Sequence, residues 1–573
     1  MKKKWIAGLL CVCLLTGSLF GGCGASKETD NNEKTTQEAT TVEETAGEIT
    51  LESPMGQANL GELNIPDDKY RTFYEVFVYS FYDGNGDGIG DIPGLIEKLD
   101  YINDGDDTTR EDLGFNGLWL MPIMPSTTYH KYDVTDYCNI DPEYGTLEDF
   151  KKLIKECHDR DISVIIDFVM NHTSSKHTWF VTACEYLQGL DGKEPSEEEC
   201  PYFGYYHFSQ NQETGYWYQV PGTDWYYEGK FWSEMPDLNL ENKAVREEFG
   251  KIADFWLDLG VDGFRLDAAK EYESDNTTAN VEILSWFNDM VKAKKEDAYI
   301  VAEVWTDIGT YAKYYESGID SVFNFGFANN DGLIANVAKG SGSYDATRYG
   351  LGVASLKERF GKYNENYIDA PFYTNHDTGR SAGYYGGEFA EAQTKISGAL
   401  NLFMSGAAFV YYGEELGMKG SGKDENKRAP MYWSEDAAAE GMCAGPKDME
   451  TVEMKYPSLE EQKDDSYSIY NFYKQAVLLR NRYPEIARGE VSFVEELSNE
   501  SVCVLTKKYE DSKIMLLFNL SPEKKTVDLS AMKIEGLNAD SLEIGGMLLT
   551  GKEATEKGNT DVVLPGYSVT ILK

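Results

Sequence analysis

Eight short apolar runs alternate with amphipathic stretches along most of this chain, and this alternation most narrows the folds open to it. The runs are EVFVYSF, GFNGLWLMPI, ISVIIDFVM, VDGFRLD, AYIVAEVW, SVFNFGF, PFYTN and GAAFVYYGEE. Between them lie stretches such as 147–161 and 245–260, whose apolar residues recur at helical spacing. Eight repeated strand–helix units predict an α/β fold, a closed (β/α)8 TIM barrel whose chemistry gathers after the strands.

Two departures from this alternation predict additional domains. About 90 residues, rich in Tyr, Trp and Gly, separate the third run from the fourth, so we expect an inserted domain over residues 173–234. From residue 489 short alternating strands follow one another, which predicts a C-terminal antiparallel β-sandwich over residues 489–573. The barrel is then expected over residues 62–172 and 235–488.

The first 61 residues carry targeting signals. Three lysines precede an apolar run and small residues before Cys23, which predicts a secretion signal over residues 1–22. The LFGGC stretch resembles a bacterial lipobox, in which Cys23 becomes the lipidated first residue; an ordinary signal peptide cut nearby is the alternative. Residues 23–61 have few large apolar side chains and are predicted to be a disordered tether. We therefore expect an extracellular protein anchored to the cell membrane as a lipoprotein.

The charge balance narrows the class of partner. The chain has 98 acidic and 53 basic residues, for a formal net charge of −45. Such a surface repels nucleic acid and anionic lipid, so we expect no nucleic-acid partner and a neutral substrate. Of nine cysteines, Cys11 and Cys13 leave with the signal and Cys23 is the expected anchor. Among the rest, Cys184 and Cys200 lie in the insert and either pair or stay free.

The stretch YDGNGDGIGDIPG after the first apolar run spaces oxygen ligands as a calcium-binding loop does. Asp83, Asn85, Asp87 and Asp91 occupy its first, third, fifth and ninth positions, with glycine at the sixth. The twelfth position is glycine, where an EF-hand has glutamate, and the preceding stretch reads as a strand. The residues alone thus leave a calcium site and a metal-free acidic turn as alternatives.

Three carboxylates stand at the ends of predicted strands. They are Asp267 in GFRLDAAK, Glu303 in VAEVW and Asp377 in FYTNHD. Arg265 lies two residues before Asp267 and hence on the same strand face, where its guanidinium can keep that carboxylate ionised. The apolar neighbours of Glu303 should raise its pKa, which suits a general acid. Three such groups at matching places predict nucleophile, acid and base chemistry.

These motifs resemble those of the α-amylase family of retaining glycoside hydrolases, glycoside hydrolase family thirteen, from about residue 65 to the C-terminus. The matching segments are YHKYDVTDY, DFVMNH, GFRLDAAK, VAEVW and TNHD. The resemblance implies that Asp267 is the nucleophile, Glu303 the acid/base and Asp377 the transition-state stabiliser. It implies sugar-binding roles, with Asp167 bracing the site, for Tyr132, His172, Arg265, Lys270 and His376.

The same resemblance bears on the acidic loop, because many members of the family carry DxNxDGxGD directly after the first strand. It implies a structural Ca2+ ion whose ligands are Asp83, Asn85, Asp87, the carbonyl of Ile89, and Asp91. A second calcium beside the inserted domain occurs in many amylases through the asparagine matching Asn171, but its other ligands have no clear match in this sequence.

Two further motifs bear on the bond that is cleaved. MPDLN at 235–239 resembles members intermediate between oligo-1,6-glucosidases and neopullulanases, and KRAPMYW at 427–433 resembles the oligo-1,6-glucosidase side. Ala268 after the nucleophile and Lys270 at the end of DAAK favour α-1,4 bonds. The resemblance thus implies an extracellular enzyme that hydrolyses maltooligosaccharides and starch-derived α-glucans through a covalent glycosyl-enzyme.

The alternatives are oligo-1,6-glucosidase, neopullulanase or transglycosylase activity, and a non-catalytic sugar-binding lipoprotein. The intact Asp, Glu and Asp set argues against the last of these. Nothing in the sequence implies a protein partner, and the sequence leaves endo or exo action and oligomeric state open. Four aromatic residues of the insert could be sugar platforms or part of its core: Trp217, Tyr218, Trp225 and Trp232.

Overall fold

The computed structural model describes residues 68–573 apart from 107, 214, 275 and 531. The chain divides into two compact units, Met1–Thr45 and Ala46–Lys573, and every described residue belongs to the second. The predicted signal peptide, the lipidated Cys23 and the tether therefore lie outside the described residues. Within the described part of the chain, no helix is long and apolar enough to cross a membrane.

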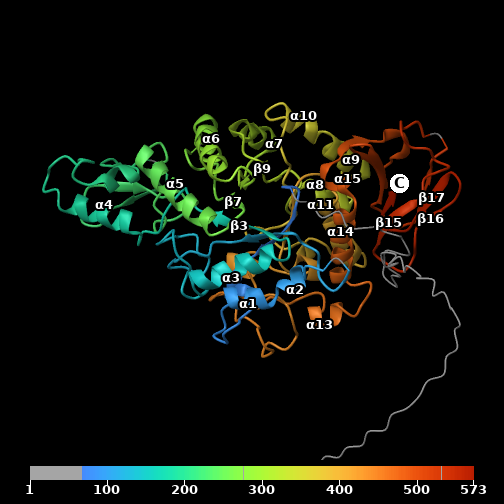
Figure 1. Cartoon of the computed structure of the whole chain (residues 1–573), viewed down its shortest axis with the longest axis horizontal. Helices are drawn as coiled ribbons and strands as arrows, with labels where there is room; N and C mark the ends of the chain where they lie inside the picture. Colours follow the sequence, from blue (N-terminus) through green and yellow to red (C-terminus); the bar gives the residue numbers. More distant parts are fainter. Residues whose placement is uncertain (1–67, 107, 214, 275, 531) are drawn as a thin grey trace, which may run out of the picture. The chain divides into compact units, whose positions relative to one another are not determined.

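Among the described residues, seven parallel strands and one further extended segment form a closed barrel, of which Figure 1 labels β3, β7 and β9. In sheet order the strands are β10 (Ala408–Tyr411), β1 (Thr72–Val76), β2 (Gly117–Leu120), β3 (Ser163–Phe168), β7 (Gly263–Leu266), β8 (Tyr299–Ala302) and β9 (Ser321–Val322). Single parallel bridges, Phe323 to Ala370 and Phe372 to Phe409, place residues 370–372 between β9 and β10 and close the ring. The predicted (β/α)8 TIM barrel is confirmed, and all eight apolar runs contribute to it.

Amphipathic helices follow the strands, and their caps show why they begin where they do. The helices between successive barrel strands include α1 (Ile92–Glu97), α3 (Leu147–His158), α5 (Lys243–Asp258), α6 (Thr277–Lys294), α8 (Leu333–Lys339) and α11 (Ala390–Leu402). α3 begins at a capping box in which Thr146 and Asp149 bond each other's backbone N–H. Its buried face, Phe150, Leu153 and Cys157, recurs at helical spacing and packs into the core.

Alternate residues of each barrel strand point inward, and they change from apolar to charged along β1. Phe73 stacks on Phe409 with ring centroids 4.8 Å apart, and Phe323 lies 4.9 Å from Phe409. Two residues beyond Phe73, Glu75 also points inward and is 1% exposed. The aromatic rings therefore fill the barrel beneath a layer of buried charged side chains.

The segment after β3 contains helix α4 (Thr178–Gln188) and a small antiparallel sheet in the order β4 (Phe208–Ser209), β6 (Tyr226–Glu228), β5 (Trp217–Gln219). Its core is aromatic: Phe180 packs against Tyr206 and Tyr227. Tyr218 and Trp225 pack within this core, as one of the two interpretations held. The insert's two cysteines are free thiols, as are the other four described cysteines, Cys138, Cys157, Cys443 and Cys503.

The C-terminal region consists of two antiparallel sheets. The larger has the order β11 (Glu490–Phe493), β12 (Val502–Tyr509), β13 (Ser512–Asn519), β18 (Ser568–Leu572), β15 (Ile544–Leu549), and the smaller β14 (Lys525–Asp528), β17 (Asp561–Leu564), β16 (Glu556–Lys557). Val502 and Val504 of β12 face the core between the sheets, whereas Cys503 and Leu505 face the main core. The predicted C-terminal antiparallel β domain is confirmed; the exact domain boundaries remain predictions.

Candidate active site

A cleft with a volume of about 670 Å³ opens among the loops that follow the barrel strands. It is lined by six predicted residues, Tyr132, His172, Asp267, Lys270, Glu303 and Asp377. Two further predicted residues, Arg265 and His376, lie beneath it and are fully buried. The structure therefore gathers the predicted catalytic and sugar-binding residues, which come from distant parts of the sequence, around one cleft.

The register of the parallel strands explains why the carboxylates meet. Leu266 of β7 pairs with Ala302 of β8, so the next residues, Asp267 and Glu303, leave their strands side by side. In the same way Asp167 of β3 pairs with Arg265 of β7. A shift of register by one residue would turn all of these side chains away from the barrel interior.

Arg265 bonds three carboxylates from the floor of the cleft. Its Nη1 lies 2.7 Å from Oδ1 of Asp167 and 2.7 Å from Oδ1 of Asp267, and its Nη2 lies 2.7 Å from Oε2 of Glu303. Burial alone would lower the pKa of Arg265, but these carboxylates raise it well above its usual value. The guanidinium is thus a permanent buried cation that orients all three acids.

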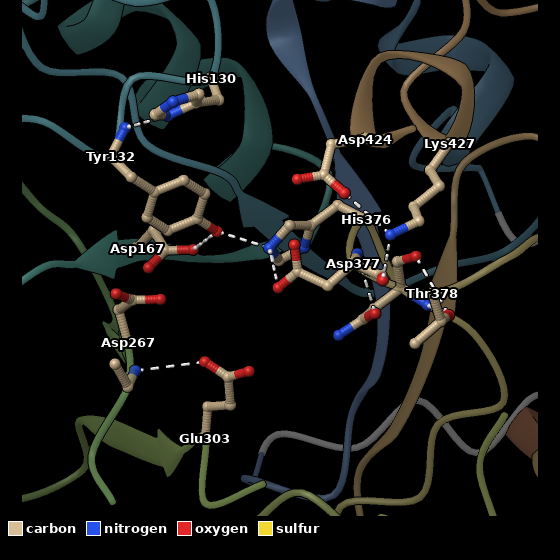
Figure 2. Close-up of polar contacts among 12 residues, drawn as sticks. His130, Tyr132, Asp167, Asp267, Glu303, His376, Asp377, Thr378, Asp424 and Lys427 are labelled. Atoms are coloured by element: carbon tan, nitrogen blue, oxygen red, sulfur yellow. Dashed lines mark hydrogen bonds and ion pairs between the residues drawn. The ribbon is translucent and has the colours of Figure 1, made fainter. Parts of the chain in front are cut away.

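Glu303 has the properties of a proton donor at neutral pH. Burial raises its pKa to about 7, with Asp267 and Asp377 adding to the effect and Arg265 opposing it. Its Oε2 also accepts a hydrogen bond of 3.2 Å from the backbone N–H of Ala268 (Figure 2). The direction agrees with the expectation from its apolar neighbours. Burial likewise raises the pKa of Asp167, to about 6.

Asp377 is held as an anion on the opposite side of the cleft. Its Oδ1 lies 2.8 Å from Nη2 of Arg428, its Oδ2 lies 3.2 Å from Nε2 of His376, and Lys427 donates to its backbone carbonyl. Burial tends to raise the pKa of Asp377, but His376 and Arg428 outweigh it and hold that pKa well below its usual range. Figure 2 shows Asp377 beside His376, away from the Asp267–Glu303 pair.

His172 presents an unsatisfied polar atom to the cleft. The residue is 2% exposed, and its Nε2 has no hydrogen-bond partner. Burial lowers the pKa of His172, so its ring is neutral at pH 7. A buried polar atom without a partner is costly unless a ligand completes it. A hydroxyl of a bound sugar would supply that partner.

Exposed aromatic side chains line the cleft. Phe231, Trp232 and Trp305 are 51%, 46% and 48% exposed, and all three line the cleft. Trp232 therefore fits the interpretation as a sugar platform. Phe231 and Trp305 are two further cleft aromatics that were not predicted as sugar platforms from the sequence. Trp305 directly follows the VAEV motif, so its place after the strand was available as a signal. Large exposed rings of this kind suit the apolar faces of sugars.

Every lysine and arginine that lines the cleft is paired with a carboxylate. Lys270 lies 2.8 Å from Glu271, and Lys427 lies 2.8 Å from Asp424. Arg428 is paired with Asp377. The cleft thus offers no uncompensated cation to a phosphate or carboxylate group, and its charge balance suits a neutral ligand.

A second, shallower hollow of about 510 Å³ adjoins the cleft. It shares three lining residues with the cleft, His130, Trp232 and Asp424, and continues past Tyr129 and Glu425. A linear ligand seated at the carboxylates therefore has room to continue beyond them.

Two cleft-side residues with clear partners were not assigned from the sequence. Glu75 lies 2.5 Å from Nδ1 of His376, and Arg428 holds Asp377. Glu75 is the only charged residue in its apolar run, TFYEVFVYSF, and this was a usable signal. Arg428 belongs to KRAPMYW, the motif that bears on bond specificity in the sequence.

The acidic loop at 83–91 is closed by its own backbone. Asp83 accepts hydrogen bonds from the N–H groups of Asn85, Gly86 and Gly88. Asp91 caps α1 through Oδ1, while its Oδ2 is buried without a hydrogen-bond partner. Across the described residues, no group of three or more His, Cys, Asp and Glu side chains is placed to hold a metal ion. The calcium site therefore stays a prediction.

This loop is also joined to the loop after β10. The N–H of Asp83 donates to the carbonyl of Gly441 at 2.9 Å, and the N–H of Ala444 donates to that of Gly88 at 2.8 Å. Nearer the cleft, the hydroxyl of Ser80 donates to the carbonyl of Arg428 at 2.8 Å. The loops after the first and last strands thus form one hydrogen-bonded unit.

A TIM barrel with two carboxyl groups side by side at the ends of adjacent strands has the arrangement that glycoside hydrolases use. The chain belongs to the α-amylase family: residues 75–489 match the alpha amylase catalytic domain. The solved structure of Eubacterium rectale Amy13B is 52% identical, with a TM-score of 0.85 over 89% of this chain and 97% of that one. The family predicted from the motifs is thus confirmed.

Two curated relatives indicate the range of activities named within this family. "Alpha-amylase 3" of Dictyoglomus thermophilum is 37% identical over 89% of this chain and 94% of its own length. "Probable oligo-1,6-glucosidase 3" of Bacillus subtilis is 27% identical over 88% of this chain and 98% of its own length.

The pKa of Glu303 predicts the alkaline limb of activity. A reaction that needs Glu303 protonated runs below its pKa of about 7 and slows as pH rises through that value. We expect log kcat/KM on a maltooligosaccharide to fall by about one unit per pH unit above pH 7.

The control is a dinitrophenyl maltoside, whose leaving group needs no proton. Its kcat/KM should lose this limb. An identical limb with both substrates would show that a group other than Glu303 is titrating.

Proposed function

We propose that this chain is a retaining hydrolase of α-1,4-glucosidic bonds in maltooligosaccharides and starch-derived α-glucans. The observation that carries the proposal is that one guanidinium, Arg265, bonds both Asp267 and Glu303. Retaining hydrolysis needs two carboxyl groups about 5 to 5.5 Å apart across the scissile bond. Groups that share one planar cation and leave adjacent strands side by side are suited to that separation.

In the proposed reaction, Asp267 attacks the anomeric carbon while Glu303 gives its proton to the leaving oxygen. A carboxylate–carbon bond forms as the glycosidic carbon–oxygen bond breaks, which gives a covalent glycosyl-enzyme. Glu303, now ionised, takes a proton from water, whose oxygen displaces Asp267 and restores both groups. Arg265 bonds one oxygen of Asp267 and so leaves the other to attack.

The remaining residues of the cleft would hold the reacting sugar. Asp377, kept ionised by His376 and Arg428, can accept hydrogen bonds from two hydroxyls and stabilise the positive charge that develops on the ring. His172 offers its free Nε2 to another hydroxyl. Tyr132 lies at the bottom of the cleft, where its ring can stack under the sugar.

Three observations support a neutral oligosaccharide as the substrate. All cations lining the cleft are paired, the exposed aromatic rings suit sugar faces, and the adjoining hollow makes room for further glucose units. The name of the relative from D. thermophilum favours α-1,4 bonds. The name of the relative from B. subtilis keeps oligo-1,6-glucosidase activity as the second candidate.

Replacing the nucleophile tests the mechanism. Asp267→Asn keeps volume and removes the charge, so we expect turnover on maltoheptaose to fall by at least about a thousandfold with little loss of stability. The first product of the wild type, followed by proton NMR, should be the α-anomer. An initial β-anomer, or a variant that keeps a tenth of wild-type activity, would overturn the assignment of Asp267.

Ala268 provides the test of bond choice. It lines the cleft, is 8% exposed and has a φ of 48°, a left-handed conformation that costs energy outside glycine. We expect the wild type to prefer maltotriose to isomaltotriose in kcat/KM, and Ala268→Val to shift the ratio towards isomaltotriose. Contacts of this size are worth about 1 to 3 kcal/mol.

Valine is strained at this φ, so the variant will also lose stability. The ratio of two substrates measured on one preparation does not depend on the folded fraction, and Ala268→Gly serves as the unstrained control that should keep the α-1,4 preference. If the wild type had a higher kcat/KM on isomaltotriose than on maltotriose, the result would contradict the α-1,4 assignment and favour oligo-1,6-glucosidase activity.

We also propose that the loop at 83–91 holds Ca2+ through Asp83, Asn85, Asp87, the Ile89 carbonyl and Asp91. The donors are all hard oxygens, as calcium prefers, and the buried Oδ2 of Asp91 lacks any other partner. Burial raises the pKa of Asp91, and a bound cation would relieve that cost. The ion would stabilise the loop and take no step in the reaction.

Chelation tests the calcium proposal. An ion present at a hundred times its Kd stabilises by about 2.7 kcal/mol, so EDTA should lower the Tm of the wild type and do little to Asp87→Ala. Asp465→Ala removes a similarly exposed aspartate that bonds the N–H two residues on, and it should respond to EDTA as the wild type does. Equal responses in wild type and Asp87→Ala would refute the site.

We further propose that the protein is extracellular and anchored to the cell membrane through lipid on Cys23. The LFGGC stretch after an apolar segment supports this proposal. Cys23→Ala should release the protein from the membrane fraction and abolish labelling by radioactive palmitate, whereas Cys13→Ala should change neither. A wild type found free in the medium would contradict the anchor.

A further inference from the structure

Glu75 is a buried carboxylate behind the cleft that the proposed reaction does not use. It lies near the C-terminal end of β1, which runs between β10 and β2, and it is 1% exposed. Its Oε1 lies 2.5 Å from Nδ1 of His376, which is fully buried. The residue does not line the cleft, and the direct contact of its carboxylate on the cleft side is with His376.

The second nitrogen of His376 faces the cleft residues. Nε2 lies 2.7 Å from the hydroxyl of Tyr132 and 3.2 Å from Oδ2 of Asp377. That hydroxyl donates its own proton to Oδ2 of Asp167 at 3.0 Å, so its oxygen is left to accept from Nε2 (Figure 2). A carboxylate oxygen of Asp377 likewise only accepts. Both ring nitrogens of His376 therefore face acceptors.

Only the imidazolium form of histidine donates from both nitrogens. A neutral ring that kept its proton on Nδ1 for Glu75 would turn a lone pair towards Asp377. Such a ring would repel that carboxylate and leave Nη1 of Arg265, at 3.2 Å, as the donor to the Tyr132 oxygen. With Glu75 ionised, the hydrogen-bond pattern thus needs a protonated His376, and Glu75 is the group that faces the side of the ring away from the cleft.

We propose that Glu75 is a positioning residue that keeps His376 as a double donor and, through it, fixes Asp377 and Tyr132 at the reacting sugar. Its effect on turnover rests on the proposed glycosidase function, whereas its effect on His376 does not.

The charges around the ring agree with this proposal. Those that face it from the packed elements and the cleft are Glu75, Asp167, Arg265, Glu303, Asp377 and Arg428. Burial lowers the pKa of His376, but Asp377 and Glu75 outweigh it and raise the pKa to about 9. Burial raises the pKa of Glu75, and His376 opposes that rise. Each group therefore favours the ionised form of the other.

Nitrogen NMR of 15N-histidine-labelled protein tests the first half of the proposal. The chain has six histidines, so the spectrum contains few signals, and those of His376 can be assigned from their loss in a His376→Gln variant. In the wild type, both nitrogens of His376 should carry protons up to about pH 8. In Glu75→Gln, which keeps volume and an acceptor, the pKa of His376 should fall by about 1 to 3 units. A neutral His376 in the wild type at pH 7, or an unchanged pKa in the variant, would overturn the proposal.

The pH dependence of kcat/KM tests the second half. Above pH 7 the wild type loses one proton, from Glu303, because His376 stays charged to about pH 9. In Glu75→Gln the lowered pKa of His376 means that His376 also loses its proton over this pH range. The fall of kcat/KM with pH should therefore be steeper, and the pH optimum should be more acidic. Activity near pH 5.5 should recover to within about tenfold of the wild type. A variant that loses activity equally at every pH would show a merely structural role.

Two variants serve as controls for the effect of Glu75→Gln. Glu415→Gln removes another fully buried glutamate, which bonds Tyr74 and Tyr101 instead of a histidine, and it should leave the pH profile unchanged. Glu75→Asp restores the charge and should return the limb to one proton. If Glu75→Gln fails to fold, Glu75→Asp and the wild-type NMR titration still decide. If the wild type hydrolyses no α-glucan, the proposed function fails while the NMR result stands.

Discussion

The site depends on one buried guanidinium. Arg265 is fully buried, and it bonds a carboxylate from its own strand and from each neighbouring strand. A buried charge is costly unless it is paired and hydrogen-bonded, and here each partner needs the other. The rigid fork of arginine donors fixes the carboxyl groups as well as neutralising them, which a lysine could not do. The geometry of the acids is therefore set by the barrel itself rather than by mobile loops.

The wider charge pattern suits a reaction that builds positive charge on a sugar. With Glu303 protonated, the remaining carboxylates of this network are Glu75, Asp167, Asp267 and Asp377, and the cations that face them are Arg265, His376 and Arg428. The carboxylates exceed the cations by one. A net negative charge in the network would favour the positive charge that develops on a sugar ring during glycoside hydrolysis over the neutral substrate.

Much of the fold and part of the site could be predicted because their signals are local. A strand followed by a carboxylate, as at Asp267 and Glu303, is visible in a few adjacent residues. Glu75 and His376 are 301 positions apart in the sequence, and no local pattern predicts that they form a pair. The left-handed φ of Ala268 likewise arises only when distant segments meet. The same is true of the packing that buries part of Trp225 in the core of the insert and leaves Trp232 exposed. The run PFYTN, residues 371–375, was expected as a barrel strand; residues 370–372 occupy that place, but they pair with their neighbours only through two single bridges.

The hydrogen bonds that join the first and last barrel strands have a consequence for how the protein becomes active. Thr72 of β1 pairs with Ala408 of β10, and the loops beyond them are joined from Ser80 to Arg428 and from Asp83 to Gly441. These contacts close a loop of chain of well over 300 residues, so their entropy cost is met late in folding. Arg428 can reach Asp377 only once these hydrogen bonds between the first and last strands and their loops have formed. A chain still emerging from its ribosome, with every strand but the last in place, would have Asp267 and Glu303 side by side and yet lack the side of the cleft that holds Asp377.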